Sequence, residues 1–374
     1  MKKRKLFLPF VIILTFVAGL LTGIFSSITT KTVTVQEMSL SKKQSQTKEV
    51  PKEDNKVLIG YVQDFRNPYE IDYDNLTHII FSFAHPTKDG NVLLNGDTAL
   101  GNLRAIVNEA DKTNTKVMLA IGGWYHMEGG ESYPYFKEAI SNPASRTKLV
   151  QELKKIVQAE QLDGIDVDFE HPRSIQDAKN LAIFIKDLKS TLEKDKKELS
   201  IAVNAKVHSV AGTEINNVQY EPTMFKDVDY VNIMAYDGQW DGDYNAANLS
   251  PFEFNKNIVN YWTHLFDSYQ INREKLVLGI PSYGQPEDPN IKQVSYGAII
   301  SNNPENAERD VVSMNGTTYH YNGVKTVQNK TELAMDNGLG GMMLWEVGLD
   351  APASYSLTRT IAKILGEIQF YALK

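Results

Sequence analysis

The sequence predicts a (β/α)8 TIM barrel with a short hairpin-containing excursion between strand 7 and strand 8. Eight short apolar runs follow residue 56, and amphipathic stretches of helical period separate most of them. This body is about 320 residues long, enough for a typical barrel of about 250 residues with insertions. A doubly wound open sheet is the alternative fold, but no G-x-G-x-x-G motif follows the first run.

The apolar runs have the length and the β-branched and aromatic character of buried parallel strands. They are VLIGYVQDF (57–65), LTHIIFSFAHP (76–86), KVMLAIGG (116–123), DGIDVDFE (163–170), LSIAVNA (199–205), VDYVNIMAYD (228–237), KLVLGIPSYG (275–284) and GGMMLWEV (340–347). The clearest helical patterns lie at 145–161, 175–197, 250–269 and 325–338. Ser250 and Pro251 are the expected N-cap pair of the third helix, and Gly338 the C-terminal cap of the fourth.

One connection is longer than the others. About 40 residues separate Gly284 from the helix that begins near Lys325, and GTTYHYNG within them indicates a hairpin. We expect this excursion at the C-terminal rim of the barrel, where barrel enzymes place their active sites.

The N-terminus is distinct from the barrel. MKKRK precedes a run without charge at 6–25, so residues 1–30 are predicted to be a signal peptide or an N-terminal membrane anchor. Residues 31–56 are expected to form a flexible polar linker, and residues 57–374 the barrel domain. The body is then extracellular or at the cell surface, and it meets a membrane only through 6–25 if that run stays uncleaved.

Composition excludes several classes of function. The chain has no cysteine, which rules out disulfides and thiolate metal sites. Its net charge is −7, which does not suit nucleic acid or an anionic lipid surface. We expect a monomer that needs no cofactor.

The fourth run carries the chemistry. Side chains alternate across a strand, so Asp166, Asp168 and Glu170 share one face and the intervening Ile, Val and Phe share the other. In a barrel the apolar face meets the helices, so the acids point into the lumen with Glu170 nearest the C-terminal mouth. Crowded, desolvated carboxyls have raised pKa values, and a carboxyl that stays protonated near neutral pH is what a general acid requires. The alternatives are a solvated surface strand and a divalent metal site. A metal site would need further Asp, Glu or His side chains at neighbouring strand ends, and the sequence shows no such cluster.

At these residues the chain resembles glycoside hydrolase family 18, the chitinase family. Its signature D-G-x-D-x-D-x-E is matched in full by residues 163–170. Further family motifs are resembled in order by GY (60–61), IGGW (121–124), MAYD (234–237), GIPSYG (279–284) and GGMMLWE (340–346). The resemblance spans nearly all of residues 57–365 and implies that 57–374 is a catalytic domain.

The resemblance implies substrate-assisted, retaining hydrolysis of β-1,4-linked N-acetylglucosamine polymers such as chitin, through an oxazolinium intermediate. Glu170 would protonate the glycosidic oxygen and then activate water. Asp168 would orient the acetamide N–H, Asp166 would share a proton with Asp168, and Tyr236 would bind the acetamide oxygen. The partner is an N-acetylglucosamine-containing polysaccharide or oligosaccharide.

The substrate-binding residues follow from the same resemblance. Asp237 would contact the −1 sugar, Met234 would pack in the pocket, and Tyr61 would support the deepest aspartate. Aromatic rings at strand ends also suit the apolar faces of pyranose rings, whatever the family. By the resemblance Trp345 looks like the floor beneath the −1 sugar, and Trp124 and Trp240, just past strands three and six, lie where leaving-side subsites would be. The fourth tryptophan, Trp262, lies within a helical pattern and is expected in the core.

Four positions depart from the family pattern. Ala120 replaces a serine that helps to hold the deep aspartate, so Asp166 is expected to depend on Tyr61 or water. His171 replaces a common tyrosine and Gln285 a common arginine, both near the substrate. Phe169 replaces a common tryptophan but faces outward. The excursion is too short for the full α+β insertion of processive relatives, so a shallower groove is predicted.

Two other functions stay open at this point. An endo-β-N-acetylglucosaminidase acting on peptidoglycan or on N-glycan cores would use the same chemistry, and His171 is compatible with it. A non-catalytic chitin- or sugar-binding protein is the alternative of a different class. Relatives that have lost catalysis usually lose the terminal acid of the signature, whereas Glu170 is present here.

Overall fold

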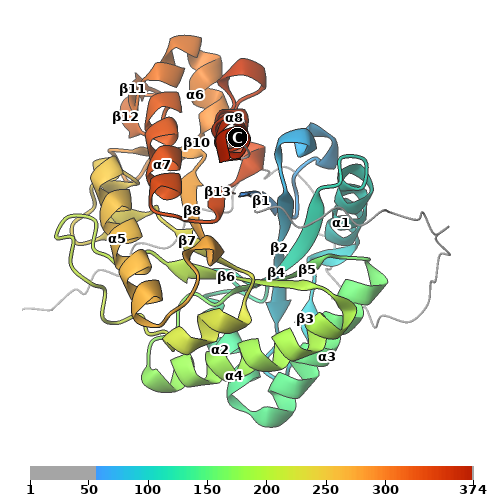
Figure 1. Cartoon of the computed structure of the whole chain (residues 1–374). Coiled ribbons are helices and arrows are strands. Elements are labelled where there is room, and N and C mark those ends of the chain that lie inside the picture. Colours follow the sequence, from blue (N-terminus) through green and yellow to red (C-terminus); the bar gives the residue numbers. More distant parts are fainter. Residues whose placement is uncertain (1–55, 373–374) are drawn as a thin grey trace, which may run out of the picture. The chain divides into compact units, whose positions relative to one another are not determined.

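The computed structural model describes residues 56–372, in which eight parallel strands close into a barrel (Figure 1). The barrel strands are β1 (Val57–Gln63), β2 (His78–Pro86), β4 (Lys116–Gly122), β5 (Gly164–Asp168), β6 (Glu198–Asn204), β7 (Tyr230–Met234), β8 (Leu276–Pro281) and β13 (Gly341–Trp345). Each pairs with the next in this order, and β1 pairs with β13 on one side and β2 on the other. A short strand, β3 (Val92–Leu93), pairs antiparallel with the end of β2. The predicted (β/α)8 barrel is therefore confirmed.

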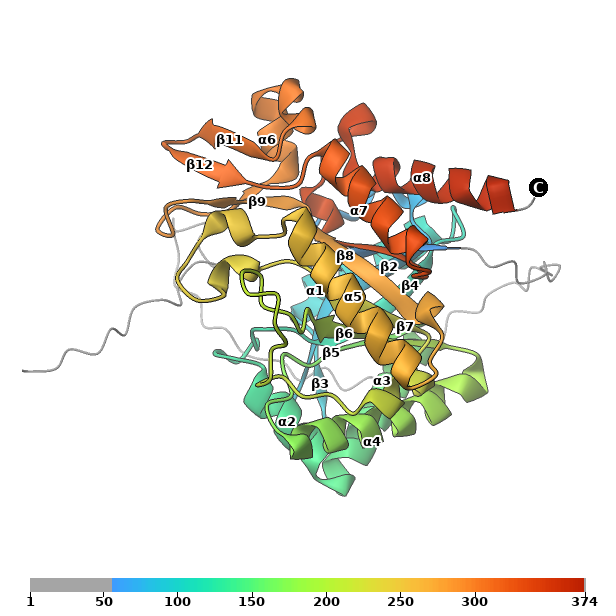
Figure 2. The ribbon, with the colours of Figure 1, turned by 60° about the vertical axis from the view of Figure 1, so that its left-hand side comes forward.

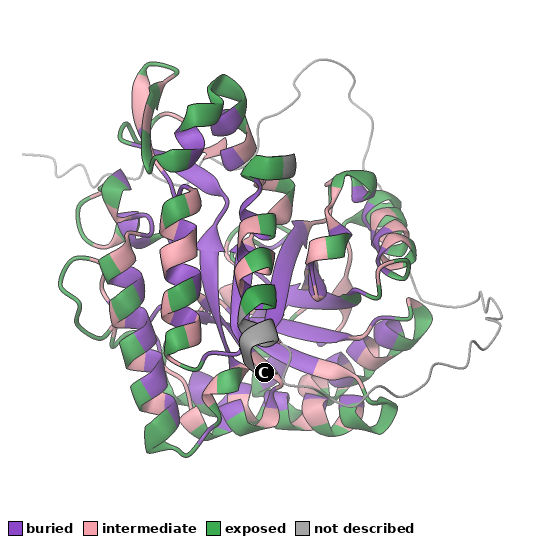
Figure 3. Cartoon of the chain, turned by 45° about the horizontal axis from the view of Figure 1, so that its top comes forward, coloured by how far each residue is buried: buried purple, intermediate pink, exposed green. Residues whose placement is uncertain are grey.

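Helices cover the outside of the barrel. They are α1 (Gly96–Ala110), α2 (Tyr133–Ser141), α3 (Pro143–Ala159), α4 (Ile175–Leu192), α5 (Phe252–Ser268), α7 (Val324–Asp336) and α8 (Leu357–Ala372). Strand residues alternate between a large core that packs against these helices and a smaller one inside the barrel: Leu58 belongs to the first, Ile59 and Tyr61 to the second. Figure 3 shows the strands buried almost throughout and the helices exposed along their outer faces.

Two predicted strands end earlier than expected. Strand β5 ends at Asp168, so Glu170 lies just beyond the strand instead of on it. The run 275–284 is not one strand: the barrel strand ends at Pro281, where the Ser282 N–H makes a last bond to the Trp345 carbonyl at 2.9 Å, and Tyr283 begins β9 in a separate sheet. The stretch 275–284 was interpreted as one apolar run, so the break after Pro281 was not predicted.

The segment beyond Ser282 forms the excursion between β8 and β13. It contains β9 (Tyr283–Pro286), β10 (Val294–Ser295), helix α6 (Tyr296–Asn302), β11 (Val311–Met314) and β12 (Thr317–His320). The predicted hairpin is β11–β12, turning at Asn315 and Gly316, both with positive φ. The four strands form a separate small sheet, which lies with α6 at one end of the molecule (Figure 2).

The expected N-cap of α5 is wrong. The helix begins at Phe252 after Pro251, and no side chain caps it. The Ser250 hydroxyl instead donates to the Ala235 carbonyl, at the end of β7, at 2.7 Å. At the end of α7 the expected glycine is in place, since Gly338 has φ +75° just after the helix.

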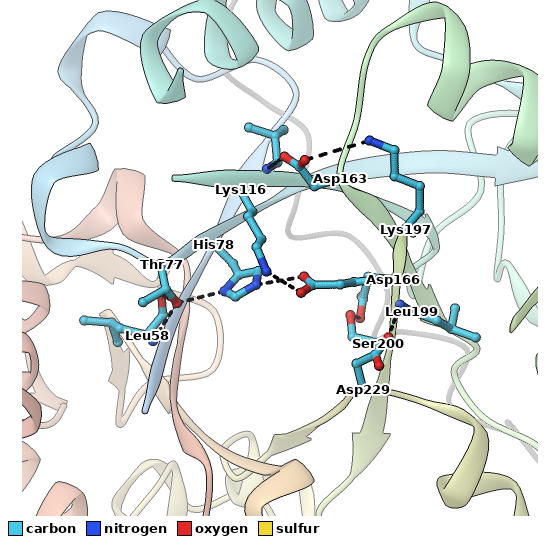
Figure 4. Close-up of polar contacts among 12 residues, drawn as sticks. Leu58, Thr77, His78, Lys116, Asp163, Asp166, Lys197, Leu199, Ser200 and Asp229 are labelled. Atoms are coloured by element: carbon cyan, nitrogen blue, oxygen red, sulfur yellow. Dashed lines mark hydrogen bonds and ion pairs between the residues drawn. The ribbon is translucent and has the colours of Figure 1, made fainter. Parts of the chain in front are cut away.

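Polar side chains close the N-terminal end of the barrel. Glu198, which begins β6, accepts from Lys116 on β4 and lies 2.9 Å from Nε2 of His78 on β2. Figure 4 shows His78 and Lys116 close together at this end. Asp163 accepts from the backbone N–H of Val117 at 2.9 Å. The fourth acid of the signature therefore ties two strands together at this end.

The predicted signal or anchor (1–30) lies outside the described residues, as does the linker (31–56) except for Lys56. Among the helices of residues 56–372, none combines the length and the apolar character needed to cross a bilayer.

Candidate active site

The three acids of the signature lie at the centre of the barrel and at its mouth. Strand β5 pairs with β4 and β6, and this register sets Asp166 between Ala120 and Ser200. Asp166 and Asp168 are buried, whereas the Glu170 side chain is 16% exposed. The strand direction thus orders the carboxyls from the barrel floor to the solvent.

Asp166 is held by three side chains from three other strands. It accepts hydrogen bonds from Ser200 at 2.5 Å, Tyr61 at 2.9 Å and Asn232 at 3.2 Å; Figure 4 shows Ser200 beside it. Burial raises the pKa of Asp166 to about 6, even though these donors oppose the shift. Ala120 contributes no hydrogen bond, and Ser200 and Asn232 hold the carboxylate with Tyr61. Ser200 could have been identified only from the pairing of β5 with β6, which places it opposite Asp166, and that pairing is not visible in the sequence.

Asp168 has no such partners. Its Oδ1 atom is buried without a hydrogen bond from the protein. Burial raises its pKa well above the ordinary value, and the charges of Glu170 and then Asp166 raise it further. No hydrogen-bond donor opposes this shift, whereas three oppose that of Asp166, so the protonated form is favoured more at Asp168 than at Asp166. The unpartnered oxygen is available to a ligand.

Glu170 meets the requirement for a proton donor. Burial, followed by the charge of Asp237, raises its pKa to about 8. Oε2 of Glu170 lies 3.5 Å from Nε2 of His171, whose Nδ1 has no partner. Burial, with the charge of Arg173, lowers the pKa of His171 to about 4, so its ring is neutral near pH 7.

Tyr236 and Asp237 follow the end of β7. Tyr236 is buried, and burial, followed by the charge of Asp237, raises its pKa well above the ordinary value, so the hydroxyl keeps its proton. Asp237 keeps solvent access, although partial desolvation still raises its pKa. Its Oδ1 accepts from Tyr283 at 2.6 Å and from Gln239 at 3.1 Å. Tyr283 comes from β9 and is the tyrosine of the GIPSYG motif, to which the sequence assigned no role, and Gln239 comes from the short 3-10 helix after β7.

Aromatic rings line the region around the acids. Trp345 is half-buried, 5.6 Å from the Tyr61 ring and 5.7 Å from the Phe83 ring with which it stacks. Trp124 is 39% exposed and its ring lies 6.3 Å from that of His171. Tyr61 thus contacts both the deepest carboxylate and the ring at the mouth.

The remaining expected positions are also accounted for. Trp240 is 51% exposed beside Tyr244, and Met234 is half-buried against the core inside the barrel. Gln285 is buried and donates to the Tyr244 hydroxyl at 2.8 Å. Trp262 is fully buried in the outer core, as expected. In the part of the chain that the structure describes, no three His, Asp or Glu side chains gather closely enough to bind a metal ion.

Comparison with known proteins agrees with this geometry. Probable chitinase 10 of Drosophila melanogaster is 27% identical over 363 residues, which cover 80% of this chain but 15% of that protein. Chitinase 1 of Aphanocladium album is 27% identical over 368 residues, covering 82% of this chain and 83% of that protein. The structure of the chitinase ChiB of Flavobacterium johnsoniae has a TM-score of 0.69 and 27% identity, over 84% of this chain and 95% of that one.

The family model described as glycosyl hydrolases family 18 matches residues 57–350, which is nearly the whole barrel. The match includes every acid of the signature and all the barrel strands, from β1 to β13. The chain therefore belongs to family 18 of the glycosyl hydrolases.

Proposed function

We propose that this protein is a chitinase that hydrolyses β-1,4-linked N-acetylglucosamine polymers with retention of configuration. The observation that carries the proposal is Glu170, a carboxyl with a pKa of about 8 at the barrel mouth, above an aspartate with an unpartnered oxygen. The chitinases among the relatives support the choice of chitin as substrate.

In the proposed reaction Glu170 gives its proton to the glycosidic oxygen as the bond from C1 to that oxygen breaks. The carbonyl oxygen of the substrate's own 2-acetamido group bonds to C1, which forms an oxazolinium ion. Glu170, now ionised, takes a proton from water as that water attacks C1, and the acetamide is restored.

Asp168 and Tyr236 are proposed to hold the acetamide during this reaction. The buried Oδ1 of Asp168 can accept from the acetamide N–H, and the protonated Tyr236 hydroxyl can donate to the acetamide oxygen. The negative charge of Asp166 below them would stabilise the cationic intermediate. Trp345 is proposed as the floor of the −1 subsite, with Asp237 and Met234 beside the sugar.

The aromatic rings farther along the mouth are proposed as leaving-side subsites. Trp124 and Trp240 are the exposed tryptophans there, and a sugar ring can stack on an exposed aromatic ring. Export is also proposed, on the basis of the basic and apolar N-terminus, residues 1–25.

The test is product analysis with the purified full chain. It is incubated with chito-oligosaccharides, chitin, purified peptidoglycan and a high-mannose glycopeptide, and NMR follows the anomer released first. We expect chito-oligosaccharides and chitin to be cleaved and the β-anomer to appear before mutarotation. Release from peptidoglycan or the glycopeptide alone would instead favour an endo-β-N-acetylglucosaminidase with the same chemistry. Binding without cleavage at any pH would indicate a sugar-binding protein.

The pH dependence of kcat/KM is expected to be bell-shaped. Activity should fall as the pH rises through about 8, because Glu170 then loses the proton that it must donate. It should also fall as the pH decreases through about 6, because protonation of Asp166 removes the negative charge beneath the oxazolinium ion. Initial rates on a fluorogenic chito-oligosaccharide between pH 4 and 10 measure both limbs.

The variant Asp237→Asn assigns the alkaline limb. The charge of Asp237 contributes to the raised pKa of Glu170, so its removal should move this limb to lower pH. The acid limb should stay in place, because Asp237 is not among the causes of the shift of Asp166. An alkaline limb that Asp237→Asn leaves unmoved would mean that another group titrates there.

A further inference from the structure

The turn that carries Tyr236 and Asp237 has an unfavourable backbone conformation. It comprises residues 235–238, between the end of β7 and the short 3-10 helix Gly238–Trp240. Asp237 has φ +63°, in the left-handed region that residues with a side chain seldom adopt. Such a conformation persists only where the surrounding structure holds it.

One segment holds this turn on both sides. The carbonyl of Ala235 accepts from the Ser250 hydroxyl at 2.7 Å and from the Asn255 amide at 3.2 Å. The N–H of Gly238 donates to the Leu249 carbonyl at 3.2 Å. Two consecutive residues, 249 and 250, therefore bond to the backbone before and after the functional side chains.

Lys330 holds that segment from behind. Helices α5 and α7 lie side by side in Figures 1 and 2, and Lys330 on α7 is fully buried. Its Nζ donates to the Ser250 carbonyl at 2.5 Å, the Ser250 hydroxyl at 2.7 Å and Oδ1 of Asn322 at 2.6 Å. All three acceptors are neutral oxygens. Burial lowers the pKa of Lys330 well below its usual value, and the charge of Asp310 opposes the shift.

The hydrogen bonds of Ser250 and Lys330 can each run in only one direction. The Ala235 carbonyl can only accept, so the Ser250 hydroxyl spends its one proton there. Its lone pairs then accept from Lys330 and from Asn255, the latter at 3.0 Å. The three acceptors around Nζ need three protons, which only the ammonium form supplies. The bonds that Lys330 and the Ser250 hydroxyl donate therefore have fixed directions.

We propose that Lys330 is a positioning residue for the hydrolysis: through Ser250 it fixes the 235–238 turn so that Tyr236 and Asp237 face the −1 sugar. The inference rests on the proposed function, in which those two side chains contact the substrate. A buried ammonium without a carboxylate partner is costly to desolvate, so stability alone does not favour a lysine at this position.

Kinetics of Lys330→Met on a chito-oligosaccharide test the proposal. We expect kcat to fall by about 10- to 100-fold with little change in KM, because a small misplacement of Tyr236 weakens an interaction of the transition state. In a Tyr236→Phe background, the same substitution should change kcat by less than about threefold, since coupled residues are not additive. Thr331→Val is the matched control, because it removes another buried hydrogen bond of α7, to the Val327 carbonyl, without touching Ser250.

Hydrogen–deuterium exchange tests, without substrate, whether Lys330 and Ser250 hold the 235–238 turn in place; this contact is called the clamp below. In Lys330→Met, and equally in Ser250→Ala if the first variant does not fold, amides of the 235–238 turn should exchange about tenfold faster or more. Thr331→Val should leave them as in the wild type. Wild-type kcat and exchange in a folded Lys330→Met or Ser250→Ala protein would overturn the proposal. If the wild type cleaves no substrate but the turn exchanges faster in the variants, the proposed function fails and the clamp stands.

Discussion

Glu170→Gln is expected to lower kcat on chito-oligosaccharides by about 1,000-fold, within the range that general acid catalysis contributes. Glutamine has the same shape, but its amide cannot give a proton to the glycosidic oxygen or take one from water. Substrate binding should survive, because the aromatic rings are unchanged. Single-turnover kinetics and calorimetric titration with a chito-oligosaccharide separate the two effects.

The same stretch of sequence supplies the control. Asp163→Asn also neutralises an acid of the signature, but at the opposite end of the strand, where an asparagine oxygen can still accept from the Val117 N–H. We expect its kcat to stay within about twofold of the wild type, as for most substitutions away from a site. If Glu170→Gln kept more than about a tenth of the activity, another group would have to be the acid.

The barrel was predictable because its signal is local. Each strand is a short apolar run, and α3, α4, α5 and α7 are amphipathic stretches, so periodicity locates them, whereas α1, α2 and α8 were not singled out. The acids were predictable for the same reason: alternation along 163–170 decides which side chains face inward. The ends of strands were harder to predict: 275–284 was interpreted as one run, although the barrel strand ends at Pro281.

The neighbours of the acids could not be predicted, because they come together only through register. Ser200 lies beside Asp166 because β5 and β6 pair with those two residues opposite each other. Asn232 reaches the same carboxylate from 66 positions farther along the chain. A local pattern likewise assigned Ser250 to a helix cap, whereas the fold uses its hydroxyl for Ala235 and Lys330. Tertiary contacts override such local preferences.

Asp168→Asn is expected to reduce activity and increase stability together. The kcat should fall by about 100-fold, because an asparagine amide can neither share a proton with Asp166 nor accept from the acetamide N–H as strongly as a carboxyl. Stability should rise at neutral pH. The folded state raises the pKa of Asp168 above its unfolded value, so ionisation favours unfolding at any pH above that unfolded value. A neutral amide removes this penalty.

The gain in stability should depend on pH in one direction. Below the unfolded pKa of aspartate, about 3.9, the carboxyl is protonated in both states and the variant gains nothing from the loss of charge. As the pH rises from there to neutrality, the difference in Tm between Asp168→Asn and the wild type should widen. The same pH series on Asp163→Asn, whose side chain is 42% exposed, is the control for neutralising an acid of the signature outside the barrel interior. A Tm difference that stays constant from pH 4 to 7 would show that Asp168 is already ionised at low pH in the folded protein, and the proton would then have to lie elsewhere in the site. The unpartnered Oδ1 of Asp168 costs stability in the free protein, and it is the atom proposed to accept from the substrate N–H. Asp168 would therefore reduce stability for the same reason that it supports catalysis.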